Sequence, residues 1–399
     1  MIREKKIQVI AAINSGSSSL KFGLFCHNDP LSILCTGKVS GIGTANCSLA
    51  VENASEQNEL SSCAVSAKSA EEAAAFLIEW LKHRDKQYQF EGIGHRVVHG
   101  GLLYQEPVLI DDRLMNELNR IRSLAPLHLP DSISIINVFR TAFPGISQLA
   151  HFDTAFHNSM PFEAKHYAIP RHFWTEGVVR YGFHGISCEY VYGKLTEQDH
   201  HPGSGKIIIA HLGGGSSITA LKDGRSVETS MGFSPTGGVM MNTRAGDIDP
   251  GMLIYLLKER NMNADELEHM FNMESGIKAV AASELPMEKL IEKRNVDSKA
   301  LQAIQMYSYH VRKQIGALAA AMGGLDIVVF TGGVGERSPE IRQLICSGLE
   351  FLGIELDSKL NHSSAATISD STSAVKVYII PTNEELVIAQ HVKEYLESH

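Results

Sequence analysis

The sequence contains two copies of one short pattern, about half the chain apart. The first copy is an apolar run, Ile7–Ile13, followed by Asn-Ser-Gly-Ser-Ser-Ser and a second apolar run, Leu20–Phe25. The second copy has Ile207–Leu212, then Gly-Gly-Gly-Ser-Ser, then Ile218–Leu221. Apolar runs on both sides of a glycine and serine turn predict a strand, a tight turn and a partner strand. The repeat therefore predicts a duplicated domain, with a cleft between the halves that suits ligand-induced closure.

The rest of the chain alternates between strand-like and helix-like stretches, which favours the α/β fold class. Ser69–His83 has helical periodicity, with Ala73, Phe76, Leu77 and Trp80 on one face. The polar segment from residue 48 to residue 68 predicts exposed strands and loops. Further helices are expected at Ser298–Met322 and Glu384–Leu396, and further strands at Ile327–Phe330 and Val375–Ile380.

Composition limits the class of protein and its partners. A chain of 399 residues is too long for one ordinary core, and 44% hydrophobic with 20% charged residues is typical of a soluble globular protein. The net charge of -9 argues against nucleic acid or an acidic membrane as the main partner, although it permits a local basic pocket. Neither a cleavable signal pattern nor an apolar stretch of membrane-spanning length is present, so we expect a cytoplasmic protein. The six cysteines show no C-x-x-C spacing, which predicts free thiols in a reducing compartment.

The two glycine and serine turns are candidate anion-binding sites. Glycine tolerates the backbone angles that point several N–H groups at one ligand. In the first copy Asn14, Ser17, Ser19 and Lys21 add polar side chains, whereas residues 213–217 of the second copy are almost bare backbone. The alternative is a pair of ordinary β-turns. Two matching copies on duplicated strands favour the binding role.

A third glycine cluster, Thr331–Glu336, follows an expected strand and precedes a helix expected to begin near Pro339. This arrangement is typical of anion binding between a strand and a helix. The G-x-G-x-x-G spacing of the dinucleotide fingerprint fails, and the chain contains no G-x-x-x-x-G-K-[ST] sequence, so a P-loop is excluded.

Two arginines stand in apolar or glycine-rich surroundings. Arg96 lies in Gly-His-Arg-Val-Val-His-Gly-Gly, directly after an expected short strand, and Arg244 lies in Met-Met-Asn-Thr-Arg-Ala-Gly-Asp. Phosphoryl transfer spreads negative charge over equatorial oxygens, and a guanidinium group there is worth on the order of 10³–10⁵ in rate. The alternative for each arginine is a structural ion pair, with Asp247 or Asp249 in the case of Arg244.

Two segments combine histidine with aromatic residues, His-Phe-Asp-Thr-Ala-Phe-His from residue 151 and Tyr-Gly-Phe-His-Gly from residue 181. His151, Asp153 and His157 would share a face if their segment were a strand, and such ligands suit zinc, although no further ligand is evident. Asp153 could instead position a Mg²⁺-bound phosphate, and His184 could donate to a developing anion. A role as core histidines remains open for His151 and His157.

Taken together, these segments resemble the acetate kinase family, within the larger group of actin-like, hexokinase-like duplicated kinases. The matching motifs run from Asn14 to Glu385 in family order: N-S-G-S-S-S-L-K, G-H-R-V-V-H-G-G, L-A-P-L-H, F-D-T-A-F-H, R-Y-G-F-H-G, H-L-G-x-G-S-S, S-M-G-F-S-P, M-M-x-T-R-x-G-D-I-D-P, F-T-G-G-V-G-E and T-N-E-E-L. The resemblance implies two duplicated domains of the actin-like, ribonuclease H-like fold around a central cleft. It places an acceptor-side domain at residues 1–154 plus 386–399 and a nucleotide-side domain at residues 155–385.

The resemblance also implies roles for residues of the acceptor side. Asp153 would be the catalytic acid/base or orient the acceptor, Arg96 would bind the carboxylate or its phosphate, and Arg244 with His184 would stabilise the transferring phosphoryl group. Asn14 and Glu384 would hold Mg²⁺ or Mn²⁺, the second through water, although the segment before Glu384 is explained equally well as a helix N-cap. The apolar pocket for the acetate methyl and an adjoining active-site histidine would be formed by Val98, Leu127, Phe183, Pro235 and His128.

On the donor side the resemblance implies contacts to ATP or ADP from the three glycine clusters and their neighbours. These residues are Ser17, Ser19, Lys21, His211, Leu212, Gly213, Gly214, Gly215, Gly333, Val334, Gly335, Glu336 and Arg337. The departures from the family pattern gather here. Gly214 and Arg337 each stand where the family commonly has Asn, and Pro286-Met287-Glu288 stands where an Asp-x-Arg element usually frames the adenine.

We therefore expect reversible, Mg²⁺-dependent, direct in-line phosphoryl transfer between ATP and acetate, giving acetyl phosphate and ADP. The alternatives are a kinase for propionate or another short-chain acid, since one methylene is worth only about 1–3 kcal/mol in an apolar pocket, and the same acceptor chemistry with a different phosphoryl donor. A non-catalytic, nucleotide-binding, actin-like protein is a more remote alternative. The family suggests a homodimer.

Overall fold

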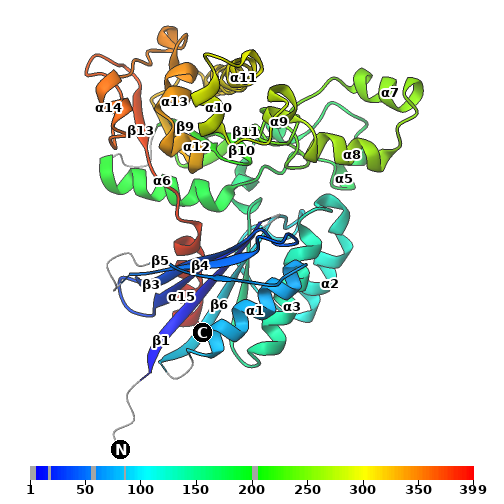
Figure 1. The fold of residues 1–399 in the computed structure, drawn as a ribbon, viewed down its shortest axis with the longest axis vertical. Coiled ribbons are helices and arrows are strands. Elements are labelled where there is room, and N and C mark those ends of the chain that lie inside the picture. Colours follow the sequence, from blue (N-terminus) through cyan, green and yellow to red (C-terminus); the bar gives the residue numbers. More distant parts are fainter. Residues whose placement is uncertain (1–5, 17–18, 55–59, 85–86, 200–204) are drawn as a thin grey trace, which may run out of the picture. The chain divides into compact units, whose positions relative to one another are not determined.

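The computed structural model describes residues 6–16, 19–54, 60–84, 87–199 and 205–399. It divides into two compact units (Figure 1). Unit 1 consists of residues 1–155 together with 383–399, and unit 2 consists of residues 156–382. Both units combine strands and helices, which confirms the predicted α/β fold class.

In the described part of unit 1, eight strands form one sheet in the order β5-β4-β3-β2-β1-β6-β8-β7. The predicted first hairpin is confirmed, because β1 and β2 pair antiparallel with Ile13 opposite Phe22 and Gly16 opposite Ser19. Strand β6 is parallel to β1 on one side and to β8 on the other. The strands are β1 (Ile7–Gly16), β2 (Ser19–Cys26), β3 (Ser32–Ser40), β4 (Ser48–Asn53), β5 (Leu60–Ala64), β6 (Tyr88–Val97), β7 (Val108–Leu109) and β8 (Ser147–Phe152).

Helices cover both faces of this sheet. Ile93 of β6 belongs to a core shared with α1 (Ala70–Lys82) and α3 (Leu129–Ala142), and the predicted helix boundary is confirmed by the Ser69 N-cap. The glycines on either side of Ile93 face the opposite way, toward α15 (Glu384–Ser398). Successive residues of a strand point to opposite faces, so α15 covers the second face. The unit also contains α2 (Asp112–Arg120) and a 3-10 turn at Arg122–Leu124.

The sheet of unit 2 has the order β11-β10-β9-β12-β13 in the described residues. Its first two pairs are antiparallel and its last two are parallel, as in the β3-β2-β1-β6-β8 part of unit 1. Equal strand order and direction confirm the duplication that the sequence repeat predicts. The strands are β9 (Lys206–Leu212), β10 (Ser216–Lys222), β11 (Arg225–Thr229), β12 (Ile327–Thr331) and β13 (Lys376–Ile379).

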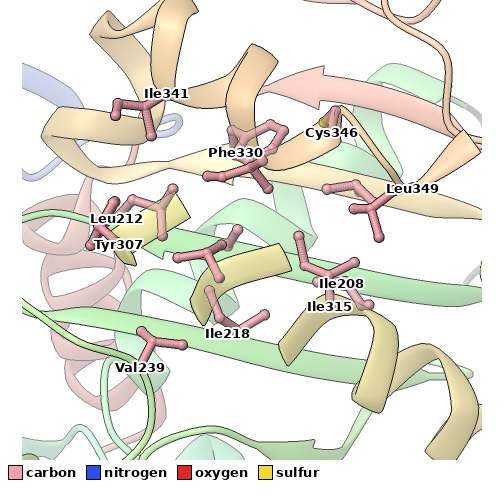
Figure 2. Close-up of a cluster of buried hydrophobic side chains, with 14 of the residues drawn as sticks. Ile208, Leu212, Ile218, Val239, Tyr307, Ile315, Phe330, Ile341, Cys346 and Leu349 are labelled. Carbon is pink, nitrogen blue, oxygen red and sulfur yellow. The ribbon is translucent and has the colours of Figure 1, made fainter. Parts of the chain in front are cut away.

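The unit 2 sheet is also buried on both faces, which explains its nearly continuous apolar strands. Ile208 and Phe330 pack with Tyr307 and Ile315 of α11 (Ser298–Met322), whose bounds match the prediction (Figure 2). On the other face Ile207, Ile209 and Val329 pack against Cys188, Val191 and Leu195 of α6 (Gly185–Asp199).

Unit 2 contains further helices. They are α4 (Phe162–Lys165), α5 (His172–Thr175), α7 (Pro250–Glu259), α8 (Ala264–Met273), α9 (Gly276–Ala281), α10 (Met287–Lys293), α12 (Gly332–Arg337), α13 (Pro339–Cys346), α14 (Ser358–His362) and 3-10 turns at Ala155–Ser159 and Glu350–Leu352. None of the helices in the described ranges is long and apolar enough to cross a membrane. All six cysteines lie in these ranges and carry free thiols, as predicted.

Candidate functional site

The candidate site residues of unit 1 gather at the carboxyl ends of neighbouring parallel strands. Arg96 is the second-last residue of β6, and Asp153 directly follows β8. The prediction placed Arg96 after a short strand, but β6 is longer and includes it, because Gly92 and Gly94 continue the ladder with β1. Carboxyl ends of adjacent parallel strands are the usual place for ligand sites in α/β sheets.

Arg96 and Asp153 form a two-pronged ion pair. The arginine Nε lies 2.9 Å from Asp153 Oδ1 and an Nη lies 2.5 Å from Oδ2. An ion pair of this kind was the structural alternative that the sequence offered for Arg96. It also sets the guanidinium plane, because two parallel hydrogen bonds allow only one orientation.

The same guanidinium reaches a second polar group, formed by Asn14 with two acidic residues of α15. Arg96 donates to Asn14 Oδ1 at 3.0 Å, and the Asn14 amide nitrogen lies 2.7 Å from Glu384 Oε2 and 2.8 Å from Glu385 Oε1. Burial disfavours the charged guanidinium, but three neighbouring carboxylates outweigh this effect and raise the pKa of Arg96 above its ordinary value. Residues 370 positions apart thus share one charged network.

The other predicted residues of unit 1 differ in their surroundings. Val98 is buried, whereas Leu127 is 43% exposed, and His128 caps α3, where its carbonyl accepts from Ser132. Ser19 and Lys21 lie in β2, with Lys21 exposed. Ser17 lies outside the described residues.

In unit 2 three predicted groups surround the second glycine turn. A Cβ at Gly215 would lie 3.2 Å from the ring of His184 and 3.4 Å from an Nη of Arg244. His211 stacks on His184, with ring centroids 4.4 Å apart. A side chain at Gly215 would therefore crowd the His184 ring and the Arg244 guanidinium. A Cβ at Gly214 would meet nothing within 4 Å, so packing does not require glycine there.

Arg244 contacts a main-chain carbonyl and the sulfur atom of Met241. Its guanidinium donates to the Pro235 carbonyl at 3.2 Å. Asp247 accepts from the Gly238 N–H at 2.7 Å, and Asp249 caps the start of α7. A carbonyl orients a guanidinium without neutralising it, which suits a group that meets a phosphoryl oxygen.

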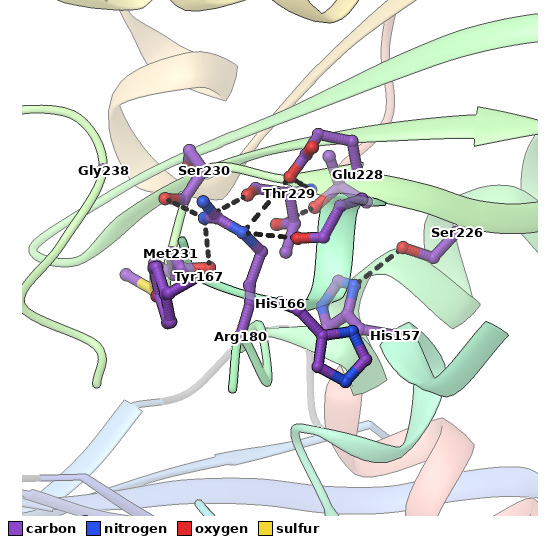
Figure 3. A network of polar contacts seen from close by, with 12 residues as sticks. His157, His166, Tyr167, Arg180, Ser226, Glu228, Thr229, Ser230, Met231 and Gly238 are labelled. Atoms are coloured by element: carbon purple, nitrogen blue, oxygen red, sulfur yellow. Dashed lines mark hydrogen bonds and ion pairs between the residues drawn. The ribbon is translucent and has the colours of Figure 1, made fainter. Parts of the chain in front are cut away.

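His184 has a left-handed backbone, with φ of 59°. The residue before it is bonded by His157, which together with Arg180 belongs to the polar network shown in Figure 3. His157 Nε2 lies 3.0 Å from the Phe183 carbonyl and its Nδ1 lies 3.0 Å from Ser226 Oγ. Arg180 donates to the carbonyls of Ala164 and Thr229 and pairs with a carboxylate of β11. A sparsely populated backbone state persists only where its surroundings hold it, and such states often mark functional sites.

The third glycine cluster has a different structure from the prediction. The expected helix near Pro339 is present as α13, but the cluster itself already forms the short helix α12 from Gly332. Glu336 explains this, since its Oε1 accepts from the Gly332 N–H at 2.9 Å and from the Thr382 N–H at 3.2 Å. The Arg337 guanidinium lies over Gly333, 2.6 Å from where a Cβ would stand. Val334 and Gly335 also lie in this helix.

The segment that departs from the family pattern before α10 is structural in this chain. Pro286 is the N-cap of α10, and Met287 is buried in the core.

The zinc alternative finds no support in its geometry. Strand β8 ends at Phe152, so His151 and Asp153 do not continue in one strand to His157, which lies in the 3-10 turn at Ala155–Ser159. Within the described ranges no group of three or more His, Cys, Asp or Glu side chains could hold a metal ion. His157 is instead a buried histidine with hydrogen bonds at both ring nitrogens, as its core alternative predicts.

Several residues of these networks were not assigned from the sequence. Arg180 stands inside the motif R-Y-G-F-H-G, and Glu385 is the second residue of a Glu-Glu pair. Ser187 follows His184 by three residues and lies on the buried face of α6 beside Cys188. A polar residue on an apolar helix face was the signal that could have identified Ser187.

Comparisons with known proteins identify the family of the chain. Residues 9–390 match the model of the acetokinase family. The chain is 38% identical over 390 residues to an acetate kinase from Rhodopseudomonas palustris, covering 96% of this chain and 97% of that protein. It is 41% identical over 391 residues to a propionate kinase from Escherichia fergusonii, covering 96% and 95%.

A crystal structure of acetate kinase from Porphyromonas gingivalis superimposes with a TM-score of 0.86 at 34% identity, covering 98% of this chain and all of that one. The family resemblance seen in the motifs is thereby confirmed. The chain belongs to the acetokinase family and is a phosphotransferase that acts on a carboxyl group.

Proposed function

We propose that this enzyme transfers the γ-phosphoryl group of ATP to acetate, giving acetyl phosphate and ADP, and that it also runs in reverse. An acetate oxygen forms the new P–O bond as the bond to the ADP oxygen breaks. The observation that carries the proposal is the grouping of His184, His211 and Arg244 around the Gly215 turn. These groups donate to phosphoryl oxygens or neutralise their charge. They lie beside a turn of glycines, which have no side chains of their own to keep a phosphate from the backbone.

We assign the donor chemistry to unit 2. Arg244 and His184 stabilise the charge on the equatorial oxygens in the transition state, and the glycine turn allows the phosphates to approach the backbone. Their positions are set by the Pro235 carbonyl and by the network behind His184. Little reorganisation is then needed when the phosphoryl group arrives, which is the main electrostatic contribution of such sites.

We assign the acceptor chemistry to unit 1. Arg96 binds the carboxylate of acetate or the phosphate of acetyl phosphate, and Asp153 orients that arginine through its two hydrogen bonds. Asp153, Asn14 and the Ser15 carbonyl take four of the five guanidinium N–H groups, so the remaining Nη hydrogen is the one that meets the acceptor oxygen. Within this unit, Val98 and Leu127 are the residues proposed to contact the methyl group.

The residues around Asn14 fit Mg²⁺ or Mn²⁺. Glu384 and Glu385 contribute hard carboxylate oxygens beside the Asn14 amide, and Mg²⁺ usually binds one or two carboxylates together with waters and substrate phosphates. When bound, the ion neutralises charge on the phosphates. Asn14 and Glu384 would hold it, the latter through water. Glu384→Gln should therefore raise the Mg²⁺ concentration needed for half-maximal activity, and an unchanged requirement would remove Glu384 from the metal site.

Acetate and propionate are not separated by the comparisons, since acetate and propionate kinases are similarly identical to this chain. An apolar pocket discriminates a methylene by only about 1–3 kcal/mol. Acceptor profiles from formate to butyrate, measured as hydroxamate formed from the acyl phosphate, test the proposal. A kcat/KM highest for acetate supports it, and a higher value for propionate identifies the enzyme as a propionate kinase instead.

The donor is the second point to test, because the departures from the family pattern lie on the donor side. Gly214 is open, Arg337 lies over Gly333, and Met287 is turned into the core. These features favour weaker selection of the nucleotide base. Comparison of kcat/KM for ATP, GTP and pyrophosphate decides this, and a strong preference for ATP would refute weak base selection. Absence of turnover with every donor would support the non-catalytic alternative.

We further propose that the protein forms a homodimer through α7. No residue of this helix is buried, and its apolar side chains Met252, Ile254, Tyr255 and Leu257 are all at least 40% exposed. A helix with this many exposed apolar residues favours a protein partner. Ile254→Asp should shift the mass measured by light scattering from dimer to monomer, whereas Val296→Asp, at a position 88% exposed, should not. A monomeric wild-type protein would refute the proposal.

A further inference from the structure

A buried serine connects the donor-side histidine to the rest of unit 2. Ser187 is the third residue of α6 and is fully buried. Its hydroxyl oxygen lies 2.8 Å from Nδ1 of His211 and 2.8 Å from the hydroxyl oxygen of Thr382. Both distances are normal for strong hydrogen bonds of a hydroxyl group.

The contact with Thr382 extends this connection to the third glycine cluster. The Thr382 N–H donates to Glu336 Oε1, the same oxygen that accepts from the Gly332 N–H. His211 near the end of β9, the start of α6, the segment after β13 and the helix α12 are therefore joined by one chain of hydrogen bonds. Each of these segments belongs to unit 2.

The other ring nitrogen of His211 faces the glycine turn. Nε2 lies 3.8 Å from the position of a Cβ at Gly213, and the ring stacks on His184. Packing against His184 restrains the ring plane, and the bond at Nδ1 restrains its rotation in that plane. Together they direct Nε2 toward the turn.

A neutral imidazole has one N–H donor and one acceptor nitrogen, and its partners decide which nitrogen carries the proton. The Ser187 hydroxyl has a single proton. If it donates to Nδ1, it accepts from Thr382, and His211 carries its proton on Nε2. If it accepts from Nδ1, it donates to Thr382, and Nε2 is left as an acceptor, which repels a phosphate oxygen.

We propose that Ser187 is a positioning residue, which donates to Nδ1 of His211 and so keeps the proton on Nε2, where it is donated to a phosphoryl oxygen. Thr382 completes the arrangement by donating to Ser187. The catalytic part of this inference rests on the proposed function, whereas the placement of the proton is a property of the ligand-free protein.

The test uses full-length protein with Ser187→Ala, Ser187→Thr and Thr382→Val. Nitrogen-15 spectra of the ligand-free protein distinguish a protonated Nε2 from a protonated Nδ1. We expect wild type and Ser187→Thr to carry the proton on Nε2, and Ser187→Ala to show a mixture of both forms. Ser187→Ala should also lower kcat roughly 10- to 100-fold with the KM for acetate unchanged, the range seen when partners that orient metal-binding histidines are removed, and Ser187→Thr should restore most of it.

Ser373→Ala is the matched control, since it removes another buried hydroxyl of unit 2, one that donates to the carbonyls of Gly353 and Val375. It should leave both the His211 signals and kcat unchanged. If Ser187→Ala does not fold, Thr382→Val still tests the inference: it removes the other acceptor for the Ser187 proton, so Ser187 should continue to donate to Nδ1 and Nε2 should stay protonated. A wild-type proton on Nδ1, a shift of the proton to Nδ1 in Thr382→Val, or His211 signals that Ser187→Ala does not alter, would overturn it. Absence of phosphoryl transfer in the wild type would refute the proposed function and leave the spectra as the separate test.

Discussion

Two arginines of this enzyme are held in different ways, and the difference suits their proposed roles. Arg96 lies among carboxylates and is locked in plane by Asp153, so an incoming carboxylate meets a guanidinium of fixed orientation. Arg244 is oriented by a carbonyl, which does not cancel its charge. The first arrangement favours recognition of a planar acceptor, and the second favours stabilisation of charge that develops during the reaction.

Arg244→Ala should lower kcat by at least about 100-fold, the usual scale for loss of a donor to a developing anion. The KM for acetate should change little, because the proposed interaction is made chiefly in the transition state. Steady-state hydroxamate assays measure both values. Arg171→Ala, which removes an arginine that stacks on Trp174, is the control and should retain wild-type activity. Unchanged turnover in Arg244→Ala would assign Arg244 to structure.

Buried histidines make stability depend on pH. Burial lowers the pKa of His95 and of His157 to about 4, and burial together with neighbouring histidines lowers the pKa of His151 to about 3. The folded state therefore keeps these rings neutral, while the unfolded chain takes up protons below its ordinary pKa of about 6.5. Stability should be complete above about pH 6.5 and should fall as the pH drops toward about 4.

Urea unfolding at about pH 7.5 and about pH 5 measures this effect, and His151→Leu should show a smaller difference between the two conditions than wild type. The leucine removes one group that the unfolded chain protonates. An equal pH difference in wild type and variant would show that His151 does not contribute.

At the scale of elements, the close approach of α15 to β6 depends on two glycines. A Cβ at Gly94 would lie 2.2 Å from a methyl of Ile388, and one at Gly92 would lie 2.5 Å from a methyl of Val392. The first turn of the same helix carries Glu384 and Glu385 to Asn14. The packing of helix on sheet thus sets the position of the carboxylates.

Gly94→Ala should destabilise the protein by about 1–3 kcal/mol, the cost of inserting a methyl group into a filled core. Thermal or urea unfolding measures it. Gly316→Ala, in the interior of α11 where a Cβ meets nothing within 4 Å, should instead be neutral or stabilising by up to about 1 kcal/mol. An unchanged free energy of unfolding in Gly94→Ala would mean that α15 can move away from β6 without loss of stability.

Local sequence patterns predicted helices and strands well where apolar residues recur with a regular helical or strand period. The limits of α11 and the β1–β2 hairpin follow directly from apolar periodicity and turn residues. Strand β4 was expected to be exposed, but Leu49 and Val51 are buried, because α1 packs against a sheet that extends to β4. The helix α12 was not predicted, since glycine disfavours helices and the Glu336 side chain that caps its first turn acts only in three dimensions.

In the candidate site, too, local features could be predicted from the sequence and contacts between distant residues could not. Motifs identified Arg96, Asp153, His184 and Arg244, because arginine, aspartate and histidine in glycine-rich segments are unusual locally. The contacts among them could not be predicted, because Arg96 and Asp153 are 57 positions apart and Ser187 and Thr382 are 195 apart. Such pairs depend on strand order, which the sequence does not display.

At the scale of the whole molecule, each unit has its own hydrophobic core. The core of unit 1 lies between its sheet and helices α1 and α3, and that of unit 2 lies between its sheet and α11. No residue of either core cluster belongs to the other unit. We therefore expect local stability to differ between the units.

Phe330→Ala should cost about 3–5 kcal/mol in unit 2, because the ring is fully buried between the sheet and α11. Hydrogen exchange followed by mass spectrometry should show faster exchange in β9, β10 and β12, and little change in β1 and β2. Equal acceleration in both units would show that they unfold together.

The division of unit 1 into residues 1–155 and 383–399 has a consequence for synthesis on the ribosome. The face of β6 that Gly92 and Gly94 present can be covered only after α15 has emerged, and α15 follows the whole of unit 2 in the sequence. Unit 2 is continuous in sequence and can complete its core earlier. The unit whose synthesis begins before that of unit 2 thus completes its sheet packing after it, and the nascent chain carries an uncovered sheet face throughout the synthesis of unit 2.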